Sequence, residues 1–167
     1  MKLRATQAIA TFGYVGLLPG PVGVWASAAA IPAAYALHWL GGFPLLALAT
    51  LAAGAAGYWS AKVEAIDLEG LDRGAFVIDA VVGQWIALWP LSAGLWAAGA
   101  APDVFPWPGG VAAFLFFRFF ASVRPGPVGW AARRNGPAGV MLDDVIAGAL
   151  SAALVAAAAA LAHGWLR

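Results

Sequence analysis

Three aspartates stand just inside apolar runs, where a charged side chain is costly unless it has a partner or a function. Asp79 follows Phe-Val-Ile, Asp143 and Asp144 follow Val-Met-Leu, and a long apolar run comes after each group. A charge at the centre of a membrane helix costs about 2.5–3.5 kcal/mol on insertion scales. Arg118 and Arg124 are expected to approach from the same side. Two interpretations stay open: Arg–Asp pairs that fix helix packing, or a polar pocket at the level of the lipid headgroups.

The pocket interpretation predicts a particular chemistry. Carboxylates and phosphate oxygens are ligands that Mg²⁺ prefers, and arginine matches phosphate geometry with bidentate hydrogen bonds. The stretch PGPVG occurs twice, at 19–23 and 125–129, and glycine-rich loops can direct several backbone N–H groups at an anion. Neither copy is a P-loop, because no Gly-Lys-Ser/Thr follows. A phosphate or headgroup site is therefore one prediction of these residues.

Composition identifies the elements that must position these side chains. Of the 167 residues, 63% are hydrophobic and 10% are charged, whereas soluble domains carry about 25% charged residues. A helix needs about 20 apolar residues to cross a bilayer. We therefore predict one domain over 1–167: an all-α, polytopic membrane bundle of four to five transmembrane helices. The predicted spans lie near 22–40, 44–61, 76–99 and 139–163, with a short fifth near 110–123.

The charges predict how this bundle is oriented. Most basic residues fall on one side of the predicted spans, and the opposite loops contain only Asp103, with Arg167 after the last helix. The basic residues on the crowded side are Lys2, Arg4, Lys62, Arg73, Arg118, Arg124, Arg133 and Arg134. By the positive-inside rule this side, with the N-terminus and the Gly/Pro-rich loops, is cytoplasmic. Glycines and prolines interrupt the first apolar run, so we expect no cleaved signal peptide. His38 and His163 adjoin the opposite ends and are expected at the membrane interface.

Three blocks of sequence resemble a known family. The blocks are GLLPGPVGVWAS at 16–27, DAVVGQW at 79–85, and a third made of FRFFA at 117–121, RPGP at 124–127 and GVMLDDVIAG at 139–148. In this order they resemble the motifs of the phosphatidylglycerophosphatase A family. Its members are bacterial inner-membrane enzymes that remove phosphate from phosphatidylglycerophosphate, with Mg²⁺, to give phosphatidylglycerol. The two PGPVG copies fall on different motifs of this family, which argues against an internal duplication.

The resemblance implies roles for the residues that match its motifs. Asp79, Asp143 and Asp144 would be the catalytic and Mg²⁺-binding acids. The residues implied to bind the phosphate or headgroup are Arg118, Arg124, Gly23 and Ser27. The implied location is the bacterial inner membrane, and the implied partner is an anionic glycerophospholipid headgroup, with no nucleic acid.

Departures from the family pattern fall on positions expected to bind metal, activate water or touch phosphate. Ala80 replaces the glutamate of D-E, and Ala121 replaces the aspartate of F-R-x-x-D. Further departures are Val22, Val24 and Ala132. We therefore predict a degenerate relative that serves as a non-catalytic lipid-binding or accessory subunit of a larger membrane complex. The alternatives are an active Mg²⁺-dependent lipid phosphatase, or a transporter with broken helices, although we find no inverted repeat.

Overall fold

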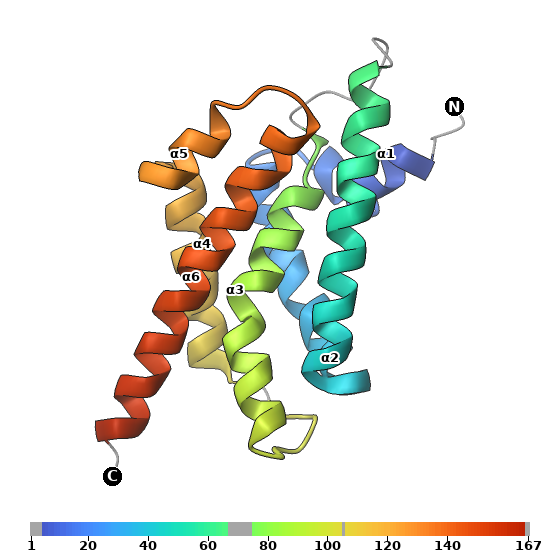
Figure 1. Ribbon diagram of the computed structural model, residues 1–167. Helices are drawn as coiled ribbons and strands as arrows, with labels where there is room; N and C mark the ends of the chain where they lie inside the picture. Colours follow the sequence, from blue (N-terminus) through green and yellow to red (C-terminus); the bar gives the residue numbers. More distant parts are fainter. Residues whose placement is uncertain (1–4, 67–74, 105, 166–167) are drawn as a thin grey trace.

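The computed structural model describes residues 5–66, 75–104 and 106–165, and every regular element in these ranges is a helix (Figure 1). The elements are α1 (Ala5–Ala10), the 3₁₀ helix η1 (Val15–Leu17), α2 (Val22–Ile66), α3 (Ile78–Ala97), α4 (Trp107–Val123), α5 (Gly126–Ala132) and α6 (Pro137–Trp165). The long helices run side by side as a bundle. The predicted all-α membrane bundle is confirmed.

Helix α2 consists of two limbs that reverse direction at Gly41–Gly42 (Figure 1). Gly42 has a φ of 66°, and a Cβ built on it would lie 2.5 Å from Cδ1 of Trp96. Both the left-handed backbone and the close indole favour glycine here. The limbs, 22–40 and 43–66, are about 28 and 36 Å long at 1.5 Å per residue, so each has the length of a membrane crossing.

Three helices are long and apolar enough to cross a membrane, or four if the bent pair α4 and α5 forms one span. The first of these three is the two-limbed α2. Helix α3 is the central one, since 56% of its membrane-length window is buried, against 17% for α2 and 22% for α6. Most residues of the first half of α3 are therefore buried inside the bundle.

Two connections between the predicted spans contain helix. The connection 124–138 contains α5. Pro127 stands in the first turn of α5, where a missing N–H costs nothing. The polar segment 62–75 is partly helical, because α2 continues to Ile66; residues 67–74 lie outside the described part of the chain.

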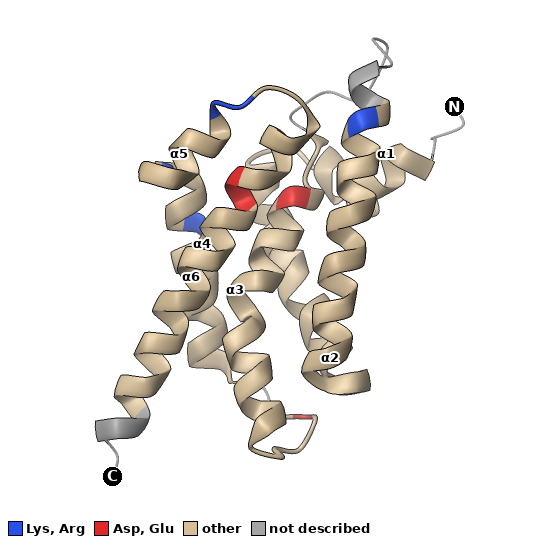
Figure 2. Ribbon diagram, viewed as in Figure 1, with Lys and Arg blue, Asp and Glu red and all other residues tan. Residues whose placement is uncertain are grey.

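Charged residues gather toward one end of the bundle (Figure 2). Coloured positions mark the end of α2, the start of α3, part of α4, the connection between α5 and α6, and the first half of α6. At the other end, the coloured position lies in the loop between α3 and α4, which contains Asp103. Among the described residues, the charge asymmetry predicted from the sequence is therefore present.

Candidate functional site

The site begins where α3 and α6 cross, because two glycines bring their backbones together. A Cβ on Gly148 would collide with the carbonyl oxygen of Gly83, and a Cβ on Gly83 would lie 2.5 Å from the carbonyl oxygen of Asp144. Small residues at such crossings let membrane helices approach closely. Asp79 lies one turn before Gly83, so the crossing places its carboxylate within electrostatic range of Asp144.

Local backbone geometry orients two of the three acids. Oδ1 of Asp79 accepts a hydrogen bond from the N–H of Ala80 at 2.8 Å. Oδ1 of Asp143 accepts one from the N–H of Asp144 at 3.0 Å. Asp79 is in the first turn of α3, where the positive end of the helix dipole favours a carboxylate. Each of these acids therefore keeps one oxygen for another partner.

Arg118 approaches the acids from α4. The neighbouring Phe117 is fully buried and anchors this part of α4 in the core. The half-buried guanidinium lies against the start of α2, because a Cβ on Gly23 would be 3.2 Å from its Nη1. Its charge interacts with those of Asp144 and Asp79. Gly23 thus leaves room for the arginine, and the predicted role of both residues in phosphate binding stays a prediction.

Arg124 and Asp143 form an ion pair, with Nη2 and Oδ2 3.3 Å apart. The Arg124 side chain is 55% exposed, whereas that of Asp143 is 9% exposed. Arg124 ends α4 with a φ of 50°, an uncommon backbone conformation for a residue other than glycine. The packing interpretation, Arg–Asp pairing, therefore describes this pair, while Arg118 has no ion-pair distance to a described acid.

Ser27 is fully buried. Its Oγ donates to the carbonyl oxygen of Gly23, 2.8 Å away in the preceding turn of α2. Serine often bonds back to its own helix in this way. Ser27 therefore lies near Gly23 but directs its hydrogen away from any headgroup, and its predicted role in binding stays a prediction.

The two alanines at motif positions belong to the packed interior. Ala80 is 4% exposed and is part of the hydrophobic core. Ala121 is partly buried and packs against that core. Neither position offers a polar atom beyond its backbone, so the site retains Asp79, Asp143 and Asp144 as its acids.

These acids do not fit a metal site that the protein could complete by itself. In the ranges that the structure describes, no group of three or more His, Cys, Asp or Glu side chains is arranged to hold a metal ion. Asp143 is engaged by Arg124, which leaves Asp79 and Asp144. Mg²⁺ is commonly held by one or two carboxylates together with substrate phosphates. Mg²⁺ binding remains a prediction, and it depends on oxygens that the lipid would bring.

Two polar residues of the interior were not predicted. Gln84 is fully buried, and neither Oε1 nor Nε2 has a hydrogen-bond partner within the described residues. The feature of the sequence that could have indicated this residue is a side-chain amide inside an apolar run. His38, expected at the interface, is 8% exposed, and its Nδ1 lies 2.7 Å from Oγ of Ser92. Ser92 therefore gives the imidazole a partner inside the bundle, and the position of His38 at the membrane interface stays a prediction; the side chain of His163 is not described.

Comparison with known proteins shows which family and which relatives the chain resembles. Residues 8–159 match the family described as Phosphatidylglycerophosphatase A. The chain is 31% identical over 141 residues to a protein of that name from Escherichia coli strain K12, covering 84% of this chain and 75% of the relative. It is 40% identical over 105 residues to a Bacteroides thetaiotaomicron protein named as a candidate phosphatidylinositol-3-phosphatase, covering 62% of this chain and 58% of that protein. No solved structure matches the chain.

The match covers all three sequence blocks and the helices that carry the acids and arginines. It extends from α1 into the last turns of α6, so it includes almost the whole bundle. The chain therefore belongs to the phosphatidylglycerophosphatase A family.

Proposed function

We propose that this membrane protein binds the phosphate of an anionic phospholipid at the charged end of the bundle and has lost most or all of the family's hydrolytic activity. The observation that carries this proposal is the alanine at position 80, packed into the core beside Asp79. A glutamate there would supply a carboxylate next to the retained acid. Ala121 is a second lost acid on α4, three residues after Arg118.

The retained residues support binding more strongly than hydrolysis. Phosphoryl transfer needs its charge neutralised and its attacking water positioned in line. Arg118 can donate bidentate hydrogen bonds to phosphate, and the exposed Arg124 can turn from Asp143 to a headgroup. A general base must reach the proton that it removes, and Asp143 is occupied by an arginine. Asp79 and Asp144 therefore have to bind the metal and also position the attacking water.

A direct test is lipid binding by native mass spectrometry in mild detergent. We expect the purified chain to retain phosphatidylglycerophosphate in preference to phosphatidylcholine, in the presence of a chelator that prevents metal-dependent turnover. Arg118→Gln should remove the preference, because it takes away the half-buried guanidinium. Arg133→Gln is the matched control, since Arg133 is exposed beyond α5. Equal retention of both lipids by the unaltered chain would contradict the proposal.

An active Mg²⁺-dependent lipid phosphatase is the second candidate. It is favoured by the retention of Asp79, Asp143, Asp144 and Arg118, and by relatives that are named as phosphatases. The decisive experiment is expression in a bacterial strain that lacks its own phosphatidylglycerophosphate phosphatases. Restored growth would establish this candidate, whereas failure despite correct membrane expression would exclude it.

The loss of hydrolysis would leave a lipid-binding protein that serves as an accessory subunit of a larger membrane complex. The chain exposes large apolar side chains on several helices, among them Leu48, Leu51, Leu115 and Phe119, and these can face lipid or another protein. Purification from native membranes in mild detergent tests this part. Co-purification of a fixed partner supports it, and a chain that is always isolated alone contradicts it.

A further inference from the structure

One face of α3 connects the charged end of the bundle to an apolar cavity. Gln84, Leu88, Leu91 and Leu95 recur at i, i+4, i+7 and i+11, the spacing that places residues on one helix face. The three leucines line the cavity. Gln84 lies between them and the start of α3, where Asp79 stands.

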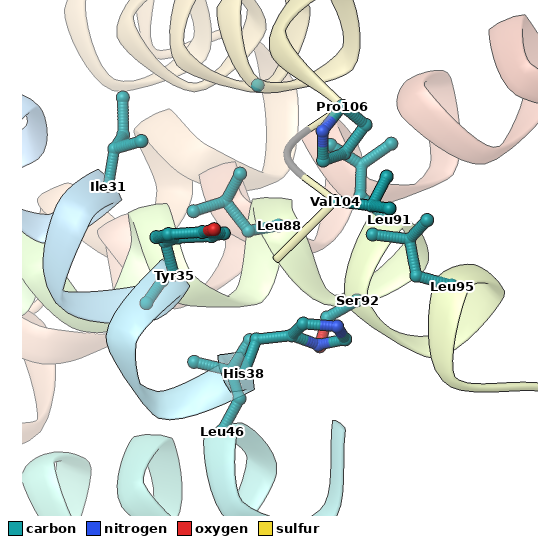
Figure 3. A pocket seen from close by; sticks show the side chains of 12 residues that line it. Ile31, Tyr35, His38, Leu46, Leu88, Leu91, Ser92, Leu95, Val104 and Pro106 are labelled. Atoms are coloured by element: carbon teal, nitrogen blue, oxygen red, sulfur yellow. The ribbon is translucent and has the colours of Figure 1, made fainter. Parts of the chain in front are cut away.

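Figure 3 shows the cavity from close by, with side chains from α2, α3 and the connection before α4 directed toward the same space. Ile31 and Tyr35 come from α2, Leu88 and Leu91 from α3, and Pro106 precedes α4. The lining is mainly apolar, and its polar side chains are Tyr35 and the hydrogen-bonded pair His38 and Ser92. The volume is about 40 Å³, which is room for about three water-sized groups. The cavity can therefore hold the end of a hydrocarbon chain.

The near edge of the cavity lies at a similar distance from the charged site along each helix. On α2, Ile31 lies eight residues after Gly23, and on α4, Gly110 lies eight residues before Arg118. On α3, Leu88 lies nine residues after the aspartate of the first turn. At 1.5 Å per residue these separations are about 12–14 Å. The cavity extends from there to Leu95, 16 residues after Asp79 and about 24 Å away along α3. Half of a hydrocarbon core is about 15 Å thick, so an extended acyl chain of a headgroup-bound lipid can reach the cavity.

Helices α2 and α4 flank this face of α3 but contact each other sparsely compared with their contacts to α3 and α6. An acyl chain that entered from the bilayer would have to pass between α2 and α4 along α3, and we call this boundary the seam. Gln84 lies on that face, fully buried and with an amide that has no partner among the described residues. A buried amide without a hydrogen-bond partner lowers the stability of the folded protein. A ligand oxygen that accepted a hydrogen bond from this amide would remove that cost.

We propose that one acyl chain of the phospholipid lies along this seam, with its end in the cavity and its ester carbonyl oxygen accepting a hydrogen bond from Nε2 of Gln84. This inference rests on the proposed function, because the lipid phosphate would be held by Arg118. Along α3, the charged site comes first, the Gln84 amide second and the apolar cavity third. A phospholipid presents its phosphate, its ester and its hydrocarbon chain in the same order.

The experiment compares dihexanoyl and dipalmitoyl phosphatidylglycerophosphate, with chelator present, as ligands of the purified chain in detergent. We expect the long-chain lipid to bind more tightly to the unaltered chain. Ala34→Leu places a larger side chain at the cavity, where Ala34 is 3% exposed, and should abolish that advantage. Ala36→Leu, on the exposed side of α2, is the matched control and should preserve it.

Gln84→Leu separates a ligand contact from a structural role. It removes an unpartnered amide, so the melting temperature should rise while dipalmitoyl lipid binds about threefold to tenfold more weakly. A purely structural glutamine would give parallel changes in both measurements. A long-chain advantage that survives Ala34→Leu, together with an unchanged lipid affinity of Gln84→Leu, would overturn the inference while leaving phosphate binding intact. Failure of the unaltered chain to bind either lipid would overturn the proposed function as well.

Discussion

At the scale of single residues, the chemistry of the site depends on which arginines and aspartates form ion pairs with each other. Because Asp79 and Asp144 each stand near a helix end on the charged side of the chain, their proximity could be predicted from the sequence. The ion pair of Arg124 with Asp143 could not be assigned, since either arginine could have paired with any of three acids. The missing partner of Gln84 was equally hidden, because side-chain packing between α2, α3 and α4 decides it.

The two arginines should differ in what they contribute. Arg118→Gln should weaken binding of phosphatidylglycerophosphate about 10-fold to 100-fold, because hydrogen bonds to charged groups contribute about 1.5–3 kcal/mol. Arg124→Gln should weaken it less and lower the free energy of unfolding by about 1 kcal/mol, since the partner of Arg124 is the poorly exposed Asp143. Lipid titration and thermal unfolding in detergent measure the two effects. Equal loss of affinity in both variants would contradict this assignment.

Magnesium should bind only together with the lipid. With two carboxylates left for a metal, we expect no change in melting temperature when Mg²⁺ is added to lipid-free protein. In the presence of phosphatidylglycerophosphate, Mg²⁺ should raise the melting temperature, because a ligand of the folded state stabilises it. Asp79→Asn should remove this response. A shift caused by Mg²⁺ alone would mean that the protein holds the metal with its own ligands.

At the scale of helices, the close approach of α3 and α6 determines whether the acids meet. The long helices were predicted from their apolar runs, and the break in α2 from Gly41–Gly42. The short α5 was not, because seven residues that include Gly and Pro carry no readable periodicity. Nor could the crossing at Gly83 and Gly148 be predicted, since Gly-rich apolar helices offer many such contacts.

The crossing can be tested with one added methyl group. Gly83→Ala should lower the free energy of unfolding by about 1–3 kcal/mol, because the new Cβ would lie 2.5 Å from the Asp144 carbonyl oxygen and the Phe117 ring. Gly94→Ala on the same helix has open space around its Cβ and should be neutral or slightly stabilising. Thermal unfolding in detergent compares them. Equal stability of the two variants would show that the helices do not cross at Gly83.

At the scale of the whole molecule, the concentration of charge at one end sets the expected orientation in the membrane. The sequence predicted this asymmetry because the basic residues cluster between particular spans. It did not predict the cavity, which needs side chains from α2, α3 and the connection before α4. The charged end is expected to face the cytoplasm, where a positive excess is typical.

The chain contains no cysteine, so single cysteines can report the orientation. Asn135→Cys, in the exposed connection before α6, should react with a membrane-impermeant maleimide only after cells are opened. Asp103→Cys, in the loop between α3 and α4, should react in intact spheroplasts. The reverse labelling pattern would place the N-terminus outside and would overturn the predicted orientation.

The central claim is that this chain binds a phospholipid phosphate without hydrolysing it efficiently. The most direct measurement is phosphate release from phosphatidylglycerophosphate by the purified protein, with Mg²⁺ and with chelator, using the Escherichia coli relative as the positive control. An Ala80→Glu/Ala121→Asp variant measured beside it shows whether the missing acids can restore turnover. We predict no Mg²⁺-dependent release above background from the unaltered chain. Mg²⁺-dependent turnover by that chain comparable to the control would contradict the claim and show that Asp79, Asp143 and Asp144 suffice for catalysis.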